Sequence, residues 1–283
     1  MIRRFHRFLL DRMVLRPSRE PLDAGEQRSM RSKVQIGHGD ETIAWFLHGE
    51  LSACRTLVLK FPGTAGRAER STSFPAGLMT SSDADADAES NRDVAVATWN
   101  PPGYGRSTGA PHLSTMADAA CAWADDVIAR GTEFGAPPRV VLCGNSLGCC
   151  IASAVAATVE PEWMLLRNPP PLRQVVPAVA ARYPLGRLVR PVVDALPTPM
   201  DLEATLPTVR CPVLMLTSGD DRLVDPASQS RLLGLHPGFN VQVVMEGLDH
   251  HDPPGHEHRK QILAAILQIQ NIARPKRNEA TCG

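Results

Sequence analysis

The chain has 283 residues, a length that suits one large domain or two small ones and is ample for a buried core. Hydrophobic residues make up 43% and charged residues 21%, and this composition excludes a disordered chain. Lysine plus arginine and aspartate plus glutamate both number 30, so the formal net charge is zero and we expect no nucleic-acid partner.

The cysteines and the apolar segments indicate the cellular compartment. The seven cysteines are odd in number and show neither a disulfide framework nor the paired spacing of a zinc site. The most apolar stretch, residues 147–159, has 13 residues, whereas roughly 20 are needed to cross a bilayer. We therefore expect reduced thiols in a cytoplasmic protein.

Residues 1–32 are predicted to form an N-terminal amphipathic helix and a linker. Residues 1–33 hold nine Lys or Arg against four Asp or Glu, and four apolar residues recur at helical spacing: Ile2, Phe5, Leu9 and Met13. Two interpretations stay open. Either the helix packs on the domain or covers its site, which we favour, or residues 1–16 make a weak peripheral contact with an anionic membrane surface.

Eight short apolar runs rich in β-forming residues come next, at residues 33–36, 42–47, 56–61, 94–100, 139–144, 163–167, 212–217 and 240–246. Helical patterns lie between them from the third run onward, for example at 114–131 and 256–273. Because the runs are continuously apolar rather than alternating, they suit strands that are covered on both faces. The pattern predicts an α/β domain over residues 33–273, with a mostly parallel, doubly wound sheet of about eight strands.

Residues 173–210 interrupt this alternation. They contain several prolines, no strand-like run and short helical groupings. We expect a helical cap insertion over the carboxyl edge of the sheet, where ligands bind in such folds. Residues 274–283 follow the last helix and are expected to form a flexible tail.

The strongest motif lies between a predicted strand and a predicted helix. Gly144, Ser146 and Gly148 form G-x-S-x-G directly after the run at 139–144. This is the setting of a nucleophile elbow, in which a serine stands on a strained turn and its neighbours two residues away must lack side chains. The turn also places the hydroxyl at a helix N-terminus, which favours a developing anion. We therefore predict Ser146 as a nucleophile.

A serine nucleophile needs a base and an orienting acid, and in a fold with this elbow the acid precedes the histidine in the chain. The strands predicted at 212–217 and 240–246 lead into candidates on the sheet edge that carries Ser146: Asp220, Asp221, Asp225, His250 and His251. Asp225 stands before Pro226, a pattern typical of a helix N-cap, so it is the weakest of the acids.

With these motifs the chain resembles the alpha/beta-hydrolase superfamily of serine hydrolases over about residues 33–273, and looks closest to its monoglyceride-lipase-like and small bacterial esterase-like branches. Residues 99–107 (WNPPGYGRS) look like the family's loop after the fourth strand. The family's acid usually stands in a Ser-Gly-x-Asp turn and its histidine three residues after a glycine. The resemblance therefore implies Asp221 and His250 as the triad partners, with their neighbours Asp220 and His251 as one-residue rivals.

The resemblance also implies an oxyanion hole. The family's third strand commonly ends in His-Gly, and the residue after them donates a backbone N–H. Here the strand ends Phe61-Pro62-Gly63-Thr64, without the histidine. Gly63 keeps the close backbone approach, so the two N–H donors are placed at Thr64 and at Leu147, directly after the nucleophile.

No cofactor or metal is expected. The glycines within residues 103–109 miss the G-x-G-x-x-G spacing of a dinucleotide site. The histidines and acids within 250–258 lack the i, i+4 pair of a zinc-binding helix. The expected partner is a small-molecule acyl substrate.

The sequence thus predicts a serine hydrolase that cleaves a carboxylic ester or thioester through an acyl-enzyme on Ser146, with His250 as the base and Asp221 as its orienting acid. Two alternatives stay open. One is an amide hydrolase, an acyltransferase or a chain-release thioesterase with the same triad. The other is a non-catalytic binding protein on this fold, which the intact Ser-Asp-His order disfavours.

Overall fold

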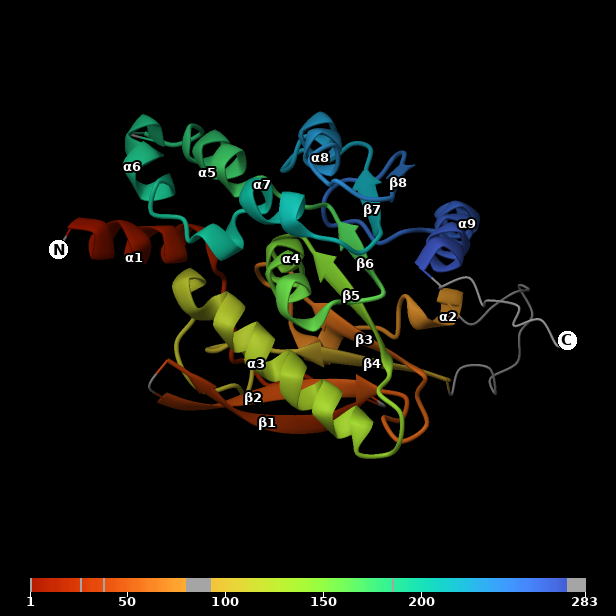
Figure 1. The fold of residues 1–283 in the computed structure, drawn as a ribbon. Coiled ribbons are helices and arrows are strands. Elements are labelled where there is room, and N and C mark those ends of the chain that lie inside the picture. Colours follow the sequence, from red (N-terminus) through yellow and green to blue (C-terminus); the bar gives the residue numbers. More distant parts are fainter. Residues whose placement is uncertain (1, 26, 38, 80–92, 185, 274–283) are drawn as a thin grey trace, which may run out of the picture.

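The centre of the molecule is an eight-stranded sheet (Figure 1). The computed structural model describes residues 2–25, 27–37, 39–79, 93–184 and 186–273, so the tail predicted at 274–283 lies outside the described residues. The strands are β1 (Arg28–Ile36), β2 (Gly39–His48), β3 (Thr56–Phe61), β4 (Val94–Trp99), β5 (Arg139–Asn145), β6 (Trp163–Arg167), β7 (Val213–Ser218) and β8 (Asn240–Met245). Across the sheet their order is β1-β2-β4-β3-β5-β6-β7-β8.

The predicted fold class is confirmed. β1 and β2 run antiparallel to their neighbours, and β3 to β8 pair in parallel. The central strands are buried along their whole length, which is why their sequences read as continuous apolar runs. β1 begins at Arg28 rather than at residue 33, because this edge strand is half exposed and its first residues are mostly polar.

Helices cover both faces of the sheet (Figure 1). On one face lie α3 (Leu113–Thr132), α4 (Leu147–Val159) and α8 (Pro226–Leu233), and on the other lie α2 (Ala76–Met79) and α9 (His256–Ala273). Alternate residues of each strand feed the two resulting cores. In β3, for example, Leu57 and Leu59 belong to the first core and Val58 to the second.

An aromatic cluster anchors α3 beneath the end of β3. The Phe61 ring packs edge-on against Trp99 and Trp123, with ring centroids 5.8 and 5.7 Å away, and Trp45 meets Trp123 at 6.2 Å. All four side chains are fully buried. Edge-to-face aromatic pairs add about 0.5–1.5 kcal/mol beyond the burial of their area, so the point where β3 leaves the sheet is held firmly.

The segment between β6 and β7 is helical. It contains α5 (Leu172–Ala180), α6 (Arg190–Val193) and α7 (Leu202–Thr205), joined by short 3₁₀ turns. An ion pair between Arg173 and Asp201, with N and O 2.5 Å apart, ties the start of α5 to the N-cap of α7. In Figure 1 these helices lie above the carboxyl ends of the central strands.

The N-terminal helix α1 (Ile2–Val14) packs against α6 and α3 (Figure 1). Its buried residues are Leu10 and Val14, whereas Ile2 and Phe5 are exposed. Leu9 and Met13, the other two residues of the expected apolar stripe, are partly buried against the core, so only the second half of that stripe packs on the domain. Within the described residues, no helix is long and apolar enough to cross a membrane.

Candidate active site

Ser146 stands on the turn between β5 and α4, with φ 51° and ψ −120°. L-residues other than glycine rarely adopt a positive φ, so this backbone is strained. The two flanking glycines are sterically required. A Cβ on Gly148 would lie 1.9 Å from the carbonyl oxygen of Phe61, and one on Gly144 would lie 2.6 Å from the Cα of Cys149. The turn therefore has the geometry expected of a nucleophile elbow.

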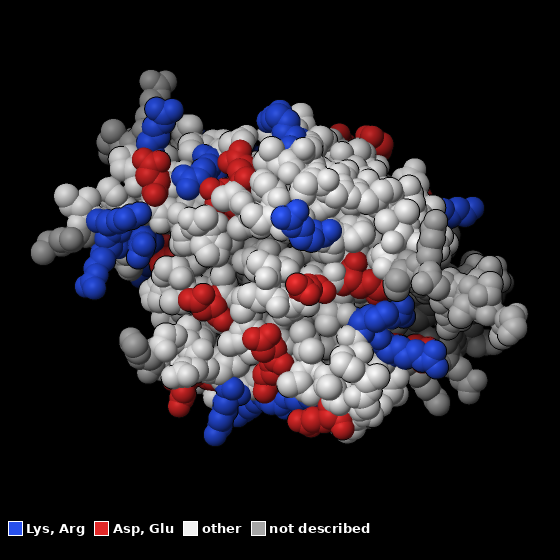
Figure 2. Space-filling view, in the orientation of Figure 1, with Lys and Arg blue, Asp and Glu red and all other residues white. Residues whose placement is uncertain are grey.

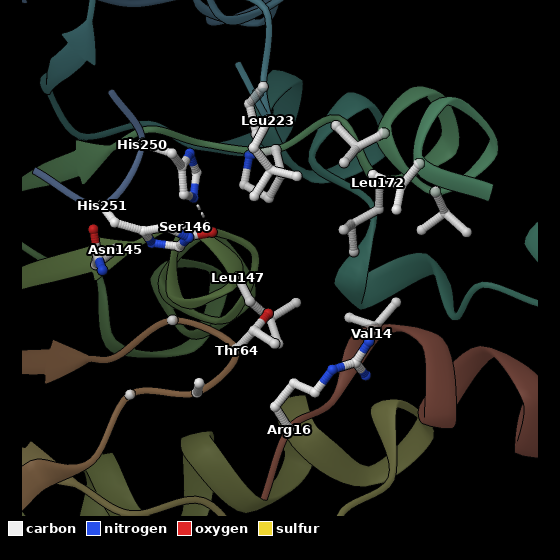
Figure 3. A pocket seen from close by; sticks show the side chains of 18 of the residues that line it. Val14, Arg16, Thr64, Asn145, Ser146, Leu147, Leu172, Leu223, His250 and His251 are labelled. Atoms are coloured by element: carbon white, nitrogen blue, oxygen red, sulfur yellow. Dashed lines mark hydrogen bonds between the residues drawn. The ribbon is translucent and has the colours of Figure 1, made fainter. Parts of the chain in front are cut away.

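The structure brings Ser146, Asp221 and His250 together in one hydrogen-bonded chain (Figure 3). Nε2 of His250 lies 2.9 Å from Oγ of Ser146, and Nδ1 of His250 lies 2.7 Å from Oδ2 of Asp221. Both Asp221 and His250 are buried. The imidazole is thus placed to take the hydroxyl proton on one nitrogen while the carboxylate holds the other.

Asp221 accepts three further hydrogen bonds. Its Oδ1 receives the backbone N–H groups of Leu223 and Val224, at 2.9 and 2.7 Å. Its Oδ2 receives Nε2 of Gln229 at 3.2 Å. These donors fix the direction of the carboxylate toward His250.

The rival residues lie elsewhere. Asp220 is exposed and makes no hydrogen bond or ion pair with either imidazole among the described residues, and His251 is exposed with its ring edge-on to that of His250, centroids 5.0 Å apart. Neither contacts the hydroxyl of Ser146. The prediction that Asp225 caps a helix is confirmed, because its side chain accepts the N–H of Ser228 at the start of α8.

Two polar side chains hold the loop that carries His250. Oδ1 of Asp249 accepts the backbone N–H groups of Arg222 and His250, at 2.9 and 2.7 Å, and so joins the acid loop to the histidine loop. These two hydrogen bonds lower the pKa of Asp249, and the bond from Arg222 has the larger effect. Asn168 donates from Nδ2 to the carbonyl of His250 at 3.1 Å and to Oγ of Ser218 at 3.0 Å, which ties the same loop to the end of β7.

The loop after β3 approaches the elbow closely. A Cβ on Gly63 would lie 3.2 Å from both the carbonyl oxygen of Asn145 and the Cβ of Ser146. Within the described part of the chain, the N–H groups of Thr64 and Leu147 donate to no backbone or side-chain acceptor. Both residues line the cavity in front of Ser146, so two free donors stand where the family resemblance placed an oxyanion hole.

Tyr104 holds this loop from beneath. Its hydroxyl donates to the carbonyl of Thr64 at 2.8 Å and accepts the backbone N–H of Arg16 at 3.1 Å. Burial raises the pKa of Tyr104 to about 12, so the phenol keeps its proton at neutral pH. The Arg16 N–H also lies 3.3 Å from the Thr64 carbonyl, so the N-terminal segment takes part in holding the loop.

Ser146 opens into a cavity of about 520 Å³. In Figure 3 the cavity extends from Ser146 and His250 toward Leu172 on one side and toward Val14 and Arg16 on the other. Its far wall is apolar and comes from α1, α5 and the loop after Asp221: Met13, Val14, Leu172, Val175, Val176, Val179, Leu223 and Val224. No aspartate or glutamate is among the described residues that line it. This is the composition of a small-molecule site with a few polar groups at one end.

Two arginines also border the cavity. Arg16 turns back on its own helix, where Nη1 donates to the carbonyls of Arg12 and Leu15 at 2.7 and 2.9 Å. Arg167 is the last residue of β6, and its Nη2 donates to the carbonyl of Asp252. Burial lowers the pKa of Arg167. Both guanidinium groups therefore already have structural partners.

Sequence reasoning missed several residues of this site. Tyr104 lies in the WNPPGYGRS segment that carries part of the family resemblance, but nothing in that segment's sequence indicates that the tyrosine supports the loop after β3. Asn168 and Asp249 stand directly beside Arg167 and His250, but polar residues after a strand are common and carry no signal of their own. The helical spacing of residues 2–13 predicted the helix α1, which forms part of the cavity wall, but it did not predict where that helix would lie.

The fold is similar to those of solved structures. An esterase from Pyrococcus furiosus superposes with a TM-score of 0.63 at 13% identity, over 90% of this chain and 97% of that chain. The Butyrivibrio proteoclasticus protein Est1E with bound ferulic acid gives a TM-score of 0.60 at 16% identity, over 87% and 100%. A membrane phospholipase A described as a bacterial virulence factor gives 0.55 at 19%, over 95% and 90%. At these identities the similarity shows the fold alone.

Comparison of sequences agrees with the fold. An uncharacterized protein of Mycobacterium tuberculosis, present in two strains, is 30% identical over 154 residues, which are 53% of this chain and 51% of that protein. The chain thus spans about half the length of the curated relatives it matches. The model of the Alpha/beta hydrolase family matches residues 38–265, which include the elbow and the loops that carry Asp221 and His250. The chain belongs to the alpha/beta hydrolase family.

Proposed function

We propose that the protein is a serine hydrolase that cleaves a carboxylic ester or thioester through an acyl-enzyme. The observation that carries this proposal is the hydrogen-bonded chain from Ser146 through His250 to Asp221, with distances of 2.9 and 2.7 Å. The strained turn at Ser146 and the two free N–H groups beside it support the same assignment. The esterase names of two structural neighbours agree with it.

In the first half of the reaction Oγ of Ser146 attacks the substrate carbonyl carbon, and the hydroxyl proton passes to Nε2 of His250. The carbonyl oxygen becomes an oxyanion and accepts the N–H groups of Thr64 and Leu147. The intermediate then collapses. The bond to the alcohol or thiol breaks, and His250 returns the proton to that leaving group. The acyl chain is left on Ser146.

In the second half a water molecule attacks the acyl carbon. His250 takes one proton from the water, a second oxyanion forms between the same N–H groups, and Ser146 leaves with the proton that His250 returns. Throughout, Asp221 holds Nδ1–H of His250, which fixes the tautomer and stabilises the imidazolium. The net change is one water consumed and one acid and one alcohol or thiol released.

The far wall of the cavity favours an acyl chain as the substrate group that it contacts. Val175, Val176 and Val179 project from α5 into the cavity, and Val14 borders it from α1. Burying each methylene of a substrate chain against such side chains contributes about 0.8 kcal/mol, or roughly fourfold in affinity. The cap and the N-terminal helix together would therefore select the substrate by the length of its acyl chain.

A fluorophosphonate probe tests the nucleophile. We expect it to label the folded wild-type protein at Ser146 and to leave Ser146→Ala unlabelled, with peptide mapping as the measurement. Ester hydrolysis by Ser146→Ala should fall by about 10⁵- to 10⁶-fold in kcat, because members of a triad act as a unit. A label on another residue, or no label on folded protein, would remove the assignment.

Two variants test which of the neighbouring residues His250 and His251 is the catalytic base. His250→Ala should lose a comparable share of kcat, because no other group lies within hydrogen-bond distance of the Ser146 hydroxyl among the described residues. His251→Ala is the matched control, since it borders the same cavity without reaching the hydroxyl. If the large loss followed His251→Ala and His250→Ala were mild, the base would have been assigned wrongly.

A further inference from the structure

The N-terminal helix α1 presents apolar side chains to solvent as well as to the protein. On its inner side Leu10 and Val14 are buried against α3 and α6. On its outer side Ile2, Phe5 and Phe8 remain 73%, 58% and 50% exposed. A single exposed phenylalanine is ordinary, but three large apolar residues within two helical turns form a surface that water disfavours.

The same helix carries an excess of positive charge. Four arginines on it are exposed: Arg3, Arg4, Arg7 and Arg12. Its one acid, Asp11, is already engaged, because it pairs with Nδ1 of His112 at 2.9 Å and accepts the N–H of Leu113 at 2.9 Å. None of the four arginines pairs with a carboxylate within the described residues, and Figure 2 shows their end of the molecule as a cluster of basic side chains.

The exposed surface lies next to the cavity that holds Ser146. The last turn of α1 supplies Met13 and Val14 to the cavity wall, and Arg16 follows directly. One helix therefore runs from the basic, apolar end of the molecule to the mouth of the site (Figure 1). Whatever the outer side of α1 rests on would be held close to the cavity.

We propose that α1 is an interfacial helix that seats the protein on an anionic lipid bilayer. Phe5 and Phe8, with Ile2, enter the boundary between headgroups and acyl chains, and the exposed arginines lie among the lipid phosphates. Exposed aromatic residues beside arginines that have no carboxylate partner among the described residues match a fluid, negatively charged surface. A protein partner would instead need a groove shaped to receive the helix and carboxylates placed to meet each arginine.

Co-sedimentation with vesicles tests the proposal. We expect wild-type protein to bind vesicles of phosphatidylcholine with one quarter phosphatidylglycerol, to bind phosphatidylcholine alone at least tenfold more weakly, and to lose binding as salt is raised. Replacing Phe5 and Phe8 together by serine should weaken binding at least tenfold. The combined change Arg3→Gln, Arg4→Gln and Arg7→Gln should weaken it by about 100-fold, since each arginine near an anionic surface contributes roughly fivefold.

Matched controls lie on other sides of the molecule. Phe134→Ser removes an equally exposed phenylalanine after the far end of α3, and Arg259→Gln with Lys260→Gln removes exposed charge from α9. Neither control should change binding. The proposal is overturned if the controls weaken binding as much as the α1 variants, or if neutral and anionic vesicles bind equally.

The result is independent of the proposed hydrolase activity. Ser146→Ala should bind vesicles like the wild type, and the Phe5 and Phe8 variant should still react with the fluorophosphonate probe in solution, because its changes lie outside the cavity. A second readout links the two sites. The wild type should hydrolyse an ester presented in anionic vesicles faster than the α1 variants do, with equal rates on a short water-soluble ester. If the wild-type protein failed to bind anionic vesicles while the probe still labelled Ser146, the hydrolase assignment would stand and α1 would not be a membrane anchor.

Discussion

The two walls of the cavity are built in different ways. The wall that carries Ser146, Asp221 and His250 consists of loops at the ends of β5, β7 and β8, and hydrogen bonds fix each of these side chains. The opposite wall consists of α1, α5 and the loop after Asp221, which meet the cavity only with apolar side chains. Hydrogen bonds are directional and tolerate little displacement, whereas apolar packing tolerates changes that keep volume and polarity.

We infer from this difference that the polar wall carries out the reaction and that the apolar wall selects the substrate. Changes in the polar wall should alter the rate or the fold, and changes in the apolar wall should alter which substrate is preferred. Variants of each wall should therefore give different kinds of effect.

Gly148→Ala should destabilise the protein most. The added Cβ would lie 1.9 Å from the backbone oxygen of Phe61, which the aromatic cluster prevents from moving away. We expect a loss of at least about 3 kcal/mol in the free energy of unfolding, which corresponds to a fall of about 6–12 °C in Tm. Gly77→Ala is the control, because a Cβ there meets open space and should leave Tm almost unchanged. Equal Tm values for the two variants would contradict a rigid polar wall.

Lengthening the acyl chain should raise kcat/KM by about fourfold per methylene until the cavity is filled. A series of p-nitrophenyl esters from acetate to octanoate measures this. Val179→Asp places a carboxylate in the apolar wall and should flatten the series, with little loss on acetate. Ala178→Asp places the same group on the exposed side of α5 and should leave the series as it is. A flat series for the wild type would mean that α5 does not contact the substrate.

Tyr104→Phe should lower kcat by about tenfold, less than the roughly 100- to 1,000-fold cost of losing an oxyanion donor outright. The variant removes the hydroxyl that holds the Thr64 carbonyl while keeping the ring in the core. KM should change little, and the rate of fluorophosphonate labelling should fall with kcat. Tyr183→Phe alters the other tyrosine of the chain, which is exposed, and serves as the control. A rise in KM at constant kcat would show that Tyr104 acts on substrate binding instead.

Asp249→Ala should have the smallest effect, a loss of roughly fivefold or less in kcat/KM at neutral pH. The hydrogen bonds from Arg222 and His250 lower the pKa of Asp249, so its carboxylate is favoured in the folded protein. The contribution of the ionised Asp249 to the free energy of unfolding is present at neutral pH and disappears as the pH falls through the lowered pKa. Wild type and variant should therefore converge in urea stability under strongly acidic conditions. A difference that persisted at the lowest pH would point to packing rather than charge.

The sequence predicts the polar wall better than the apolar one, for a local reason. Glycines two residues to either side of Ser146 are a requirement of backbone geometry, and the strand before Asp221 is buried in the sheet and reads as an apolar run. The side of α1 that packs could not be read in this way. Leu10 and Val14 are buried because α3 and α6 happen to lie there, and both partners come from distant parts of the chain.

The supporting hydrogen bonds also escape a local pattern. Tyr104 is 88 residues from Arg16, and Asn168 is 82 residues from His250, so each bond depends on the finished fold. The position of Thr64 was only partly predictable from a local pattern. The glycine before it indicated a close approach to the elbow, but the carbonyl partner that orients its loop is supplied by Tyr104 from the loop after β4.

The position of α1 matters for anyone who prepares a shortened form of this protein. The family match begins at residue 38, and a recombinant chain trimmed to residues 38–265 would keep the three residues of the hydrogen-bonded chain. It would lack the edge strand β1, the buried side chains of Leu10 and Val14, and the Arg16 N–H that meets Tyr104. Such a fragment would expose core surface to water and open the site on one side. Activity measured on it would describe a different pocket.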